Sequence, residues 1–265
     1  MHRMPNVAFA CLTLLFSSTA LRANGPFTAL KDGERFRFQI TWGIFSNAGE
    51  IVLQARRETT AGADRMHVTT RISSRGIIRG FYRFDNQSEL VIDMATGRLI
   101  SASEEGSGSK DTRTQTLFDY DRRIATHTDF LHPDRNREFA LGATDPVDLI
   151  TALIQTRDWN PKLGDHRSVD VYFSRDIYPV VIRADLLEQV KSPLGVFNTM
   201  RLTPRMETEP PRGVFKRGGE IRVWVSQSDH PQPVQMQLKL SFGSARLVLA
   251  EHEVPVSEAV REAHR

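Results

Sequence analysis

The chain has 265 residues, of which 40% are hydrophobic and 25% are charged, and its formal net charge is +3. This is the composition of an ordinary globular protein long enough to bury one sizeable core, which excludes the disordered and fibrous classes. The basic residues are scattered and form no stripe with interleaved aromatic residues, which argues against a nucleic-acid-binding protein.

The N-terminus has the layout of a secretory signal peptide. Arg3 gives a positive start, residues 7–16 form an apolar run, and residues 18–20 are the small residues of a cleavage site. The apolar run is too short to span a bilayer. We therefore expect cleavage after Ala20, or else after Ala23, and an exported periplasmic protein without a transmembrane span in the mature chain. The sole cysteine, Cys11, lies in the apolar run, so we expect no disulfide or thiol chemistry.

Most of the remaining chain has the pattern of short strands. Apolar and polar residues alternate from Arg35 to Trp42, which indicates a strand with one buried face, and a second strand over 50–57 completes a hairpin. Further strands are expected over 66–72, 81–92, 99–104, 112–120, 123–130, 168–173, 180–183, 186–191, 196–203, 220–226, 234–242 and 245–250. We predict a mainly β fold, an antiparallel, strongly curved sheet or open barrel of about 12–15 short strands. It forms a single domain over 24–252, followed by a tail over 253–265.

One segment, about 146–157, has the periodicity of an amphipathic helix. Asp145 suits the N-cap and Pro146 the first helical position. The apolar residues of its one buried face are Val147, Leu149, Ile150, Leu153 and Ile154. We expect this helix to pack on the sheet.

Arg157 lies at the end of the helix, on the apolar face, and has two interpretations. In the structural one, the cation meets the helix dipole and extends to water, or it pairs with a carboxylate. In the functional one, the guanidinium lies inside a β cup and binds an anionic ligand. We favour packing. The candidate ligand-binding residues are nevertheless Arg157, Asp145, Trp42 and Trp224, although tryptophans in such strands usually belong to the core.

Residues with metal-binding chemistry occur together in the sequence but without suitable spacing. His127, Asp129, His132 and Asp134 do not converge in a way that supplies three or four ligands, so we expect no metal and no other cofactor. Gly106-Ser107-Gly108 resembles a nucleophile motif only in composition, because it lacks a strand–turn–helix context. We assign no catalytic residue.

Several motifs resemble, in their order, those of the exported bacterial family called domain of unknown function 3108. They are an opening hairpin over 33–49, a helix from Asp145 to Arg157, a strand pair over 188–197 and a closing hairpin over 224–243. One departure is that Thr151 and Ile154 stand where the family helix often holds Ser and Tyr. The resemblance covers residues 33–249 and implies an exported, antiparallel β protein without an established activity.

The sequence therefore favours a non-enzymatic binding, carrier or scaffold module for a component of the cell envelope, such as a lipid, a glycan precursor or a protein partner. A scaffold would recruit its partner by strand addition at an exposed sheet edge. The alternative is an envelope hydrolase or glycan-modifying enzyme that uses Arg157 with a nearby carboxylate or histidine. An open pocket around Arg157 and Asp145 would favour the enzyme, and a closed surround would count against it.

Overall fold

The computed structural model describes residues 25–108, 111–240 and 243–255. The predicted signal peptide and most of the predicted tail lie outside these described residues. Within them, no helix is long and apolar enough to cross a membrane.

The described residues form one sheet of fifteen strands, in the order β8-β7-β6-β5-β4-β3-β2-β1-β15-β14-β13-β12-β11-β10-β9. The strands are β1 (Arg35–Trp42), β2 (Phe45–Thr60), β3 (Ala63–Ser74), β4 (Phe84–Asp93), β5 (Leu99–Gly108), β6 (Thr112–Asp119), β7 (Ile124–Asp129), β8 (Arg137–Ala140), β9 (Val147–Asp148), β10 (His166–Phe173), β11 (Asp176–Ser192), β12 (Gly195–Arg205), β13 (Glu220–Ser226), β14 (Pro233–Leu240) and β15 (Gly243–Glu253). The helical elements are α1 (Gly76–Phe81), α2 (Leu149–Gln155), η1 (Pro133–Arg135), η2 (Thr156–Asp158) and η3 (Gly213–Gly218). This architecture confirms the predicted mainly β fold.

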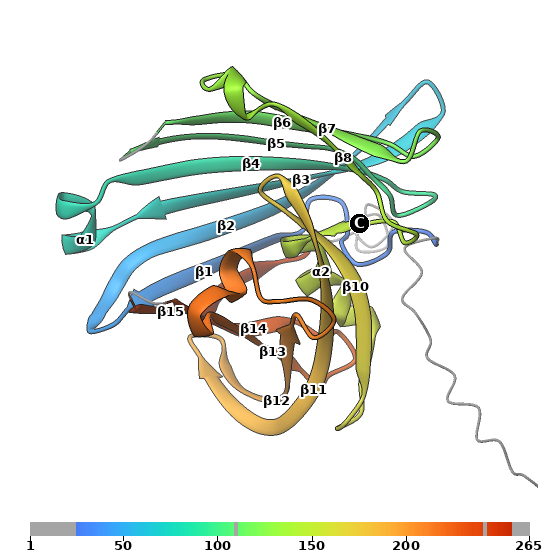
Figure 1. Cartoon of the computed structure of the whole chain (residues 1–265). Helices are drawn as coiled ribbons and strands as arrows, with labels where there is room; N and C mark the ends of the chain where they lie inside the picture. Colours follow the sequence, from blue (N-terminus) through green and yellow to red (C-terminus); the bar gives the residue numbers. More distant parts are fainter. Residues whose placement is uncertain (1–24, 109–110, 241–242, 256–265) are drawn as a thin grey trace, which may run out of the picture.

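The sheet is continuous because its first and last strands pair. β1 runs antiparallel to β15, with Arg35 opposite Glu253 and Trp42 opposite Ala245. The other neighbouring strands are consecutive along the chain and pair antiparallel, except for β9, which pairs in parallel with β10. The sheet curves so that β1–β8 form one arm and β10–β15 curl beneath it, with α2 between the arms (Figure 1). The edges of the sheet are β8 and β9.

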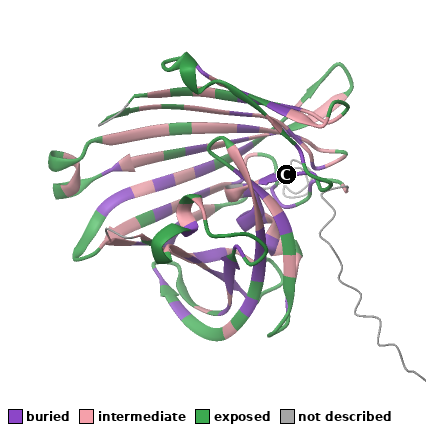
Figure 2. Cartoon of the chain, viewed as in Figure 1, coloured by how far each residue is buried: buried purple, intermediate pink, exposed green. Residues whose placement is uncertain are grey.

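The core lies on the inner face of this curved sheet (Figure 2). In β1, Phe36 and Phe38 are almost fully buried while their neighbours point outward, as the alternation predicts. Helix α2 joins two core clusters, because Ile154 packs with the β1–β7 side and Leu153 with the β10–β13 side. The apolar cavity beside α2 measures only about 20 Å³. A space of that size holds about one water molecule at most, so the inner face is filled here by side chains.

The helix begins later than the sequence predicts. Val147 and Asp148 form the short strand β9, and α2 starts at Leu149. The backbone N–H of Thr151 donates to Asp148 Oδ1 at 3.3 Å, so Asp148 occupies the capping position that we expected for Asp145. The expectation was wrong because distant arginines bind the Asp145 carboxylate instead.

Helix α1 was not predicted, and the strand expected over 81–92 begins at Phe84. Gly76, the first residue of α1, has φ +53°, a left-handed conformation that favours glycine. Helix α1 contains no buried residue, so it lacks the buried stripe that reveals a helix in a sequence. The turn expected over 43–49 is also shorter, because β2 already starts at Phe45.

Candidate functional site

Arg157 lies in a closed environment, where four residues distant in the sequence contact its guanidinium group. Its side chain is only 11% exposed, and its Nη1 lies 2.9 Å from Glu34 Oε1. Nη1 also donates to the Ala29 carbonyl at 2.8 Å, and Nε donates to the Pro231 carbonyl at 2.8 Å. The guanidinium carbon is 5.4 Å from the centre of the Phe36 ring, which adds a cation–π contact.

Glu34 is fully buried and forms the centre of this cluster. His252 Nε2 lies 2.8 Å from Glu34 Oε1, and the backbone N–H of Lys31 donates to Oε2 at 2.9 Å. Burial alone would raise the pKa of Glu34, but the hydrogen bond from His252, the bond from Lys31 and the charge of Arg157 together hold this pKa below its ordinary value. Glu34 is therefore a carboxylate at neutral pH, and its partners are protein groups. This arrangement favours the structural interpretation of Arg157.

Asp145 belongs to a separate cluster at the β4–β5 and β6–β7 turns. Its Oδ2 accepts from Arg98 Nε at 2.8 Å, and its Oδ1 accepts from Arg123 Nη1 at 2.6 Å. Burial would raise the pKa of Asp145, but the two arginine hydrogen bonds bring it below its usual range. The Arg98 guanidinium lies over the Tyr120 ring at 4.7 Å. Burial raises the pKa of the Tyr120 hydroxyl.

The two candidate tryptophans lie in different places. Trp42 is half-buried at the end of β1 and packs against the core. Trp224 is 5% exposed and packs with Val190 and Val234, while its Nε1 donates to Glu188 at 2.6 Å. The four candidate residues are therefore spread over the molecule.

The residues with metal-binding chemistry are also engaged in protein contacts. His127 Nδ1 lies 2.8 Å from the hydroxyl of Thr116, which is in turn 2.7 Å from the Tyr172 hydroxyl. Asp129 accepts the backbone N–H groups of Leu131 and His132. Among the described residues there is no group of three or more histidine, cysteine or acidic side chains that could hold a metal ion.

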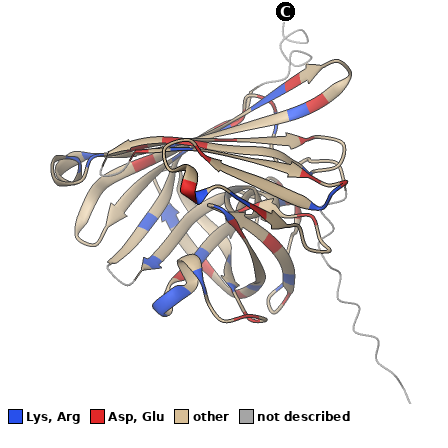
Figure 3. Ribbon diagram, turned by 45° about the horizontal axis from the view of Figure 1, so that its top comes forward, with Lys and Arg blue, Asp and Glu red and all other residues tan. Residues whose placement is uncertain are grey.

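A groove of about 560 Å³, lined mainly by polar side chains, crosses β1–β5. It lies on the outer face of the sheet, because Ile51 and Leu53 of β2 point into the core while Glu50 and Val52 line the groove. The lining residues are Arg35, Glu50, Val52, Gln54, Arg71, Ile72, Ser73, Asp85, Asn86, Gln87, Glu105, Gly106 and Ser107. Basic and acidic side chains are interleaved along the strands of this arm (Figure 3).

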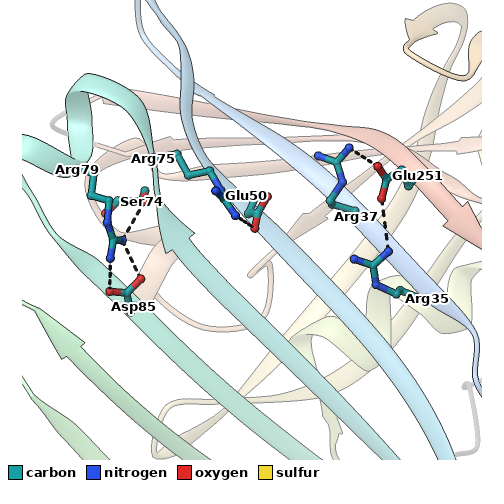
Figure 4. Close-up of polar contacts among 8 residues, drawn as sticks. All are labelled: Arg35, Arg37, Glu50, Ser74, Arg75, Arg79, Asp85 and Glu251. Atoms are coloured by element: carbon teal, nitrogen blue, oxygen red, sulfur yellow. Dashed lines mark hydrogen bonds and ion pairs between the residues drawn. The ribbon is translucent and has the colours of Figure 1, made fainter.

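Ion pairs hold the charged groups at one end of the groove (Figure 4). Arg79 binds Asp85 through two hydrogen bonds of 2.8 and 2.9 Å, and Arg75 binds Glu50. The hydrogen bond from Arg79 lowers the pKa of Asp85. Nearer to β15, the hydrogen bond from Arg37 lowers the pKa of Glu251 to about 2. The carboxylates Asp85 and Glu251 are thus ionised at neutral pH and fixed in direction.

Sequence reasoning missed the groove because its residues come from five strands. Arg71, for example, lies opposite Gln87 in β4, and Gln87 lies opposite Glu105 in β5. Each strand shows only alternate polar residues, which is also the pattern of an ordinary solvated face. The signal in the sequence is that polar residues occupy positions that face one another on neighbouring strands. It can be recognised only once the strand order and the registers are known.

The family model described as "Protein of unknown function (DUF3108)" matches residues 37–250, which confirms the resemblance of the motifs. No curated protein matches the chain significantly. The crystal structure of a "beta-barrel-like" protein of domain of unknown function DUF1849 from Brucella abortus is similar, with a TM-score of 0.52, 8% identity and coverage of 85% of this chain and 98% of that one. At this identity the likeness shows the fold alone. A proposed lipoprotein from Parabacteroides distasonis is less similar, with a TM-score of 0.33, 10% identity and coverage of 87% and 99%.

The buried cluster generates a prediction about stability. Replacing Arg157 by Met leaves the Glu34 carboxylate buried without its main cation, so we expect the free energy of unfolding to fall by about 3–5 kcal/mol. Urea denaturation measures this change. The control is Arg56→Met, which breaks the exposed pair of Arg56 with Glu58 and should leave the midpoint almost unchanged. An Arg157→Met midpoint equal to that of the control would contradict the structural role.

The pKa of Asp145 predicts how stability depends on pH. Because this pKa is lower in the folded state than in the unfolded state, the stabilisation is complete above the ordinary carboxyl pKa of about 4. It is lost as the pH falls through the folded-state value. Asp145→Asn should therefore lower the melting temperature at pH 7. The melting temperature of this variant should also fall less than that of the wild type as the pH is lowered. Asp229→Asn, at an exposed position, should follow the wild-type curve. An unchanged acid decline in Asp145→Asn would exclude this linkage.

Proposed function

The chain belongs to the DUF3108 family, and we propose that it is an exported, non-enzymatic binding module of the cell envelope whose ligand occupies the polar groove. The observation that carries the proposal is the groove itself, a hollow of about 560 Å³ across five adjacent strands. A rigid sheet holds its side chains in fixed relative positions, which is the property that a binding site requires.

The groove lining favours a polar ligand that bears a few charges. Gln54 and Gln87 supply carboxamides, Ser73 and Ser107 supply hydroxyls, and charged groups of both signs lie among them. Such groups bind the hydroxyl, acetamido and carboxylate groups of a glycan through hydrogen bonds. We therefore propose a glycan or glycan precursor as the ligand class.

A lipid carried on the inner face is disfavoured. The apolar cavity beside α2 measures about 20 Å³, whereas ligand sites for small molecules measure roughly 300–1,000 Å³. The groove, by contrast, offers few apolar side chains, chiefly Val52, since Ile72 packs against the core. An acyl chain in this surface groove would find little apolar side-chain surface to cover it.

The enzymatic alternative has less support than binding. Arg157 and Glu34 are enclosed by protein atoms, so a substrate would have no open pocket beside them. In the groove, the hydrogen bond from Arg79 lowers the pKa of Asp85, and a general acid requires a raised pKa. A fixed, ionised carboxylate suits the recognition of a polar ligand.

Arg71 provides the test. Its Nε donates to Gln87 Oε1 at 2.8 Å and its side chain lines the groove. We expect Arg71→Ala to weaken the binding of soluble cell-wall glycan fragments, which carry acetamido and carboxylate groups, by about tenfold or more, because a charge-assisted hydrogen bond is lost. Isothermal titration calorimetry measures the affinity, and native mass spectrometry of the protein purified from its source shows any ligand it retains.

Arg65→Ala is the matched control. Arg65 is exposed on the same face of the same strand but does not line the groove, so its replacement should leave the affinity unchanged. An equal loss in both variants would indicate unspecific attraction. The absence of both a bound ligand and any glycan affinity in the wild type would overturn the proposal.

A further inference from the structure

Large apolar side chains project from the end of the sheet where the β1–β2 turn and α1 lie. Ile44 is 92% exposed, Phe81 is 87% exposed and Ile77 is 66% exposed, while Phe45 and Tyr82 are also exposed. We call these five residues the apolar edge. Exposed hydrophobic groups in this density usually mark an interaction surface.

The parts of the apolar edge are held together by backbone contacts. The N–H of Arg75 donates to the Ala48 carbonyl at 2.8 Å, and a Cβ atom at Gly76 would come within 2.7 Å of the Asn47 carbonyl oxygen. Helix α1 is therefore seated against β2 directly after the turn that carries Ile44. Figure 1 shows the turn and α1 at the same end of the arm.

The same end of the sheet carries two further exposed apolar residues, Phe130 and Leu131. The N–H of Phe130 donates to the carbonyl of Arg113 at the start of β6, which places this turn beside the β5–β6 end of the arm. Seven of the fourteen exposed large hydrophobic residues in the described part of the chain thus lie at this end, in α1 and in or beside the turns. Such a distribution is concentrated rather than scattered.

The charge around the apolar edge is basic. Residues 75–83 contain Arg75, Arg79 and Arg83 and no acidic residue, and the β1–β2 turn over 43–48 is uncharged. The Arg83 side chain is 69% exposed and its Nε lies 3.3 Å from Asp85 Oδ2, so three arginines share the two carboxylates of Glu50 and Asp85 here. Arg75 and Arg79 pair with Glu50 and Asp85 from the groove side, which fixes these two cations beside the exposed Ile77 and Phe81.

We propose that the apolar edge docks on a bilayer that contains anionic phospholipids. Aliphatic and aromatic side chains on separate projecting turns can enter the interface between headgroups and acyl chains, and the neighbouring arginines then meet the phosphates. A protein partner would more commonly meet a flatter patch with a polar rim. The basic charge complements an anionic lipid surface and opposes a second copy of the same edge.

Vesicle flotation tests this proposal with the full chain. We expect the wild type to float with vesicles of phosphatidylethanolamine and phosphatidylglycerol, and to float less with phosphatidylcholine vesicles or at high salt. The double variant Ile44→Ser with Phe81→Ser should bind at least about tenfold more weakly, because it removes the two most exposed apolar groups. Both positions are on the surface, so the fold should persist, and circular dichroism checks this.

The matched control is Leu163→Ser with Leu187→Ser, which removes two exposed leucines away from the edge. It should float like the wild type, and residues 1–24 are common to all these chains. The proposal would be overturned if the edge variant floated as much as the wild type. It would also be overturned if the edge variant and the control double variant lost vesicle binding equally. The proposal would also be overturned if the wild type were a dimer that does not bind vesicles and the edge variant were a monomer. Arg71→Ala should float normally, which separates this test from that of the groove.

Discussion

The structure depends on the burial of one carboxylate. Glu34 precedes β1, and its charge is balanced by Arg157 from the segment after α2 and by a hydrogen bond with His252 of β15. A carboxylate without exposure to solvent is stable as an ion only where such partners surround it. The beginning of the sheet, the helix in its interior and the last strand are thereby fixed to one another. The pairing of β1 with β15 would otherwise be the main connection between the two arms.

This arrangement determines which surfaces remain for function. Because α2 packs against the inner face, the apolar cavity beside it measures only about 20 Å³. The alternation of each strand then directs its other side chains outward, and on β1–β5 these form the polar groove. Burying Ile51 and Leu53 therefore also orients Glu50, Val52 and Gln54.

The sequence predicts most of the strands because burial with a period of two is a local property, but it divides β11 into two strands, over 180–183 and 186–191, and misses β8. It locates the helix, but it misplaces its start, since Asp145 and Asp148 are both good caps and only the folded chain brings Arg98 and Arg123 to Asp145. Helix α1 escapes prediction because it buries no residue. The partner of Arg157 is equally inaccessible to local patterns. Many acidic residues could accept this guanidinium, and the β1–β15 closure selects Glu34. The groove requires the registers of five strands and so follows from topology alone.

The groove and the apolar edge are physically connected through two ion pairs. Glu50 and Asp85 line the groove, and their partners Arg75 and Arg79 belong to α1 and its N-terminal boundary, beside Ile77 and Phe81. A bilayer phosphate that attracts these arginines competes with the carboxylates for the same cations. Docking would then free acidic groups at the mouth of the groove, and a ligand there would in turn alter the charge presented to the membrane. Because binding free energies are linked, each event must change the affinity of the other by the same factor. The two surfaces are thus expected to act as one coupled unit, with α1 as the element that both share.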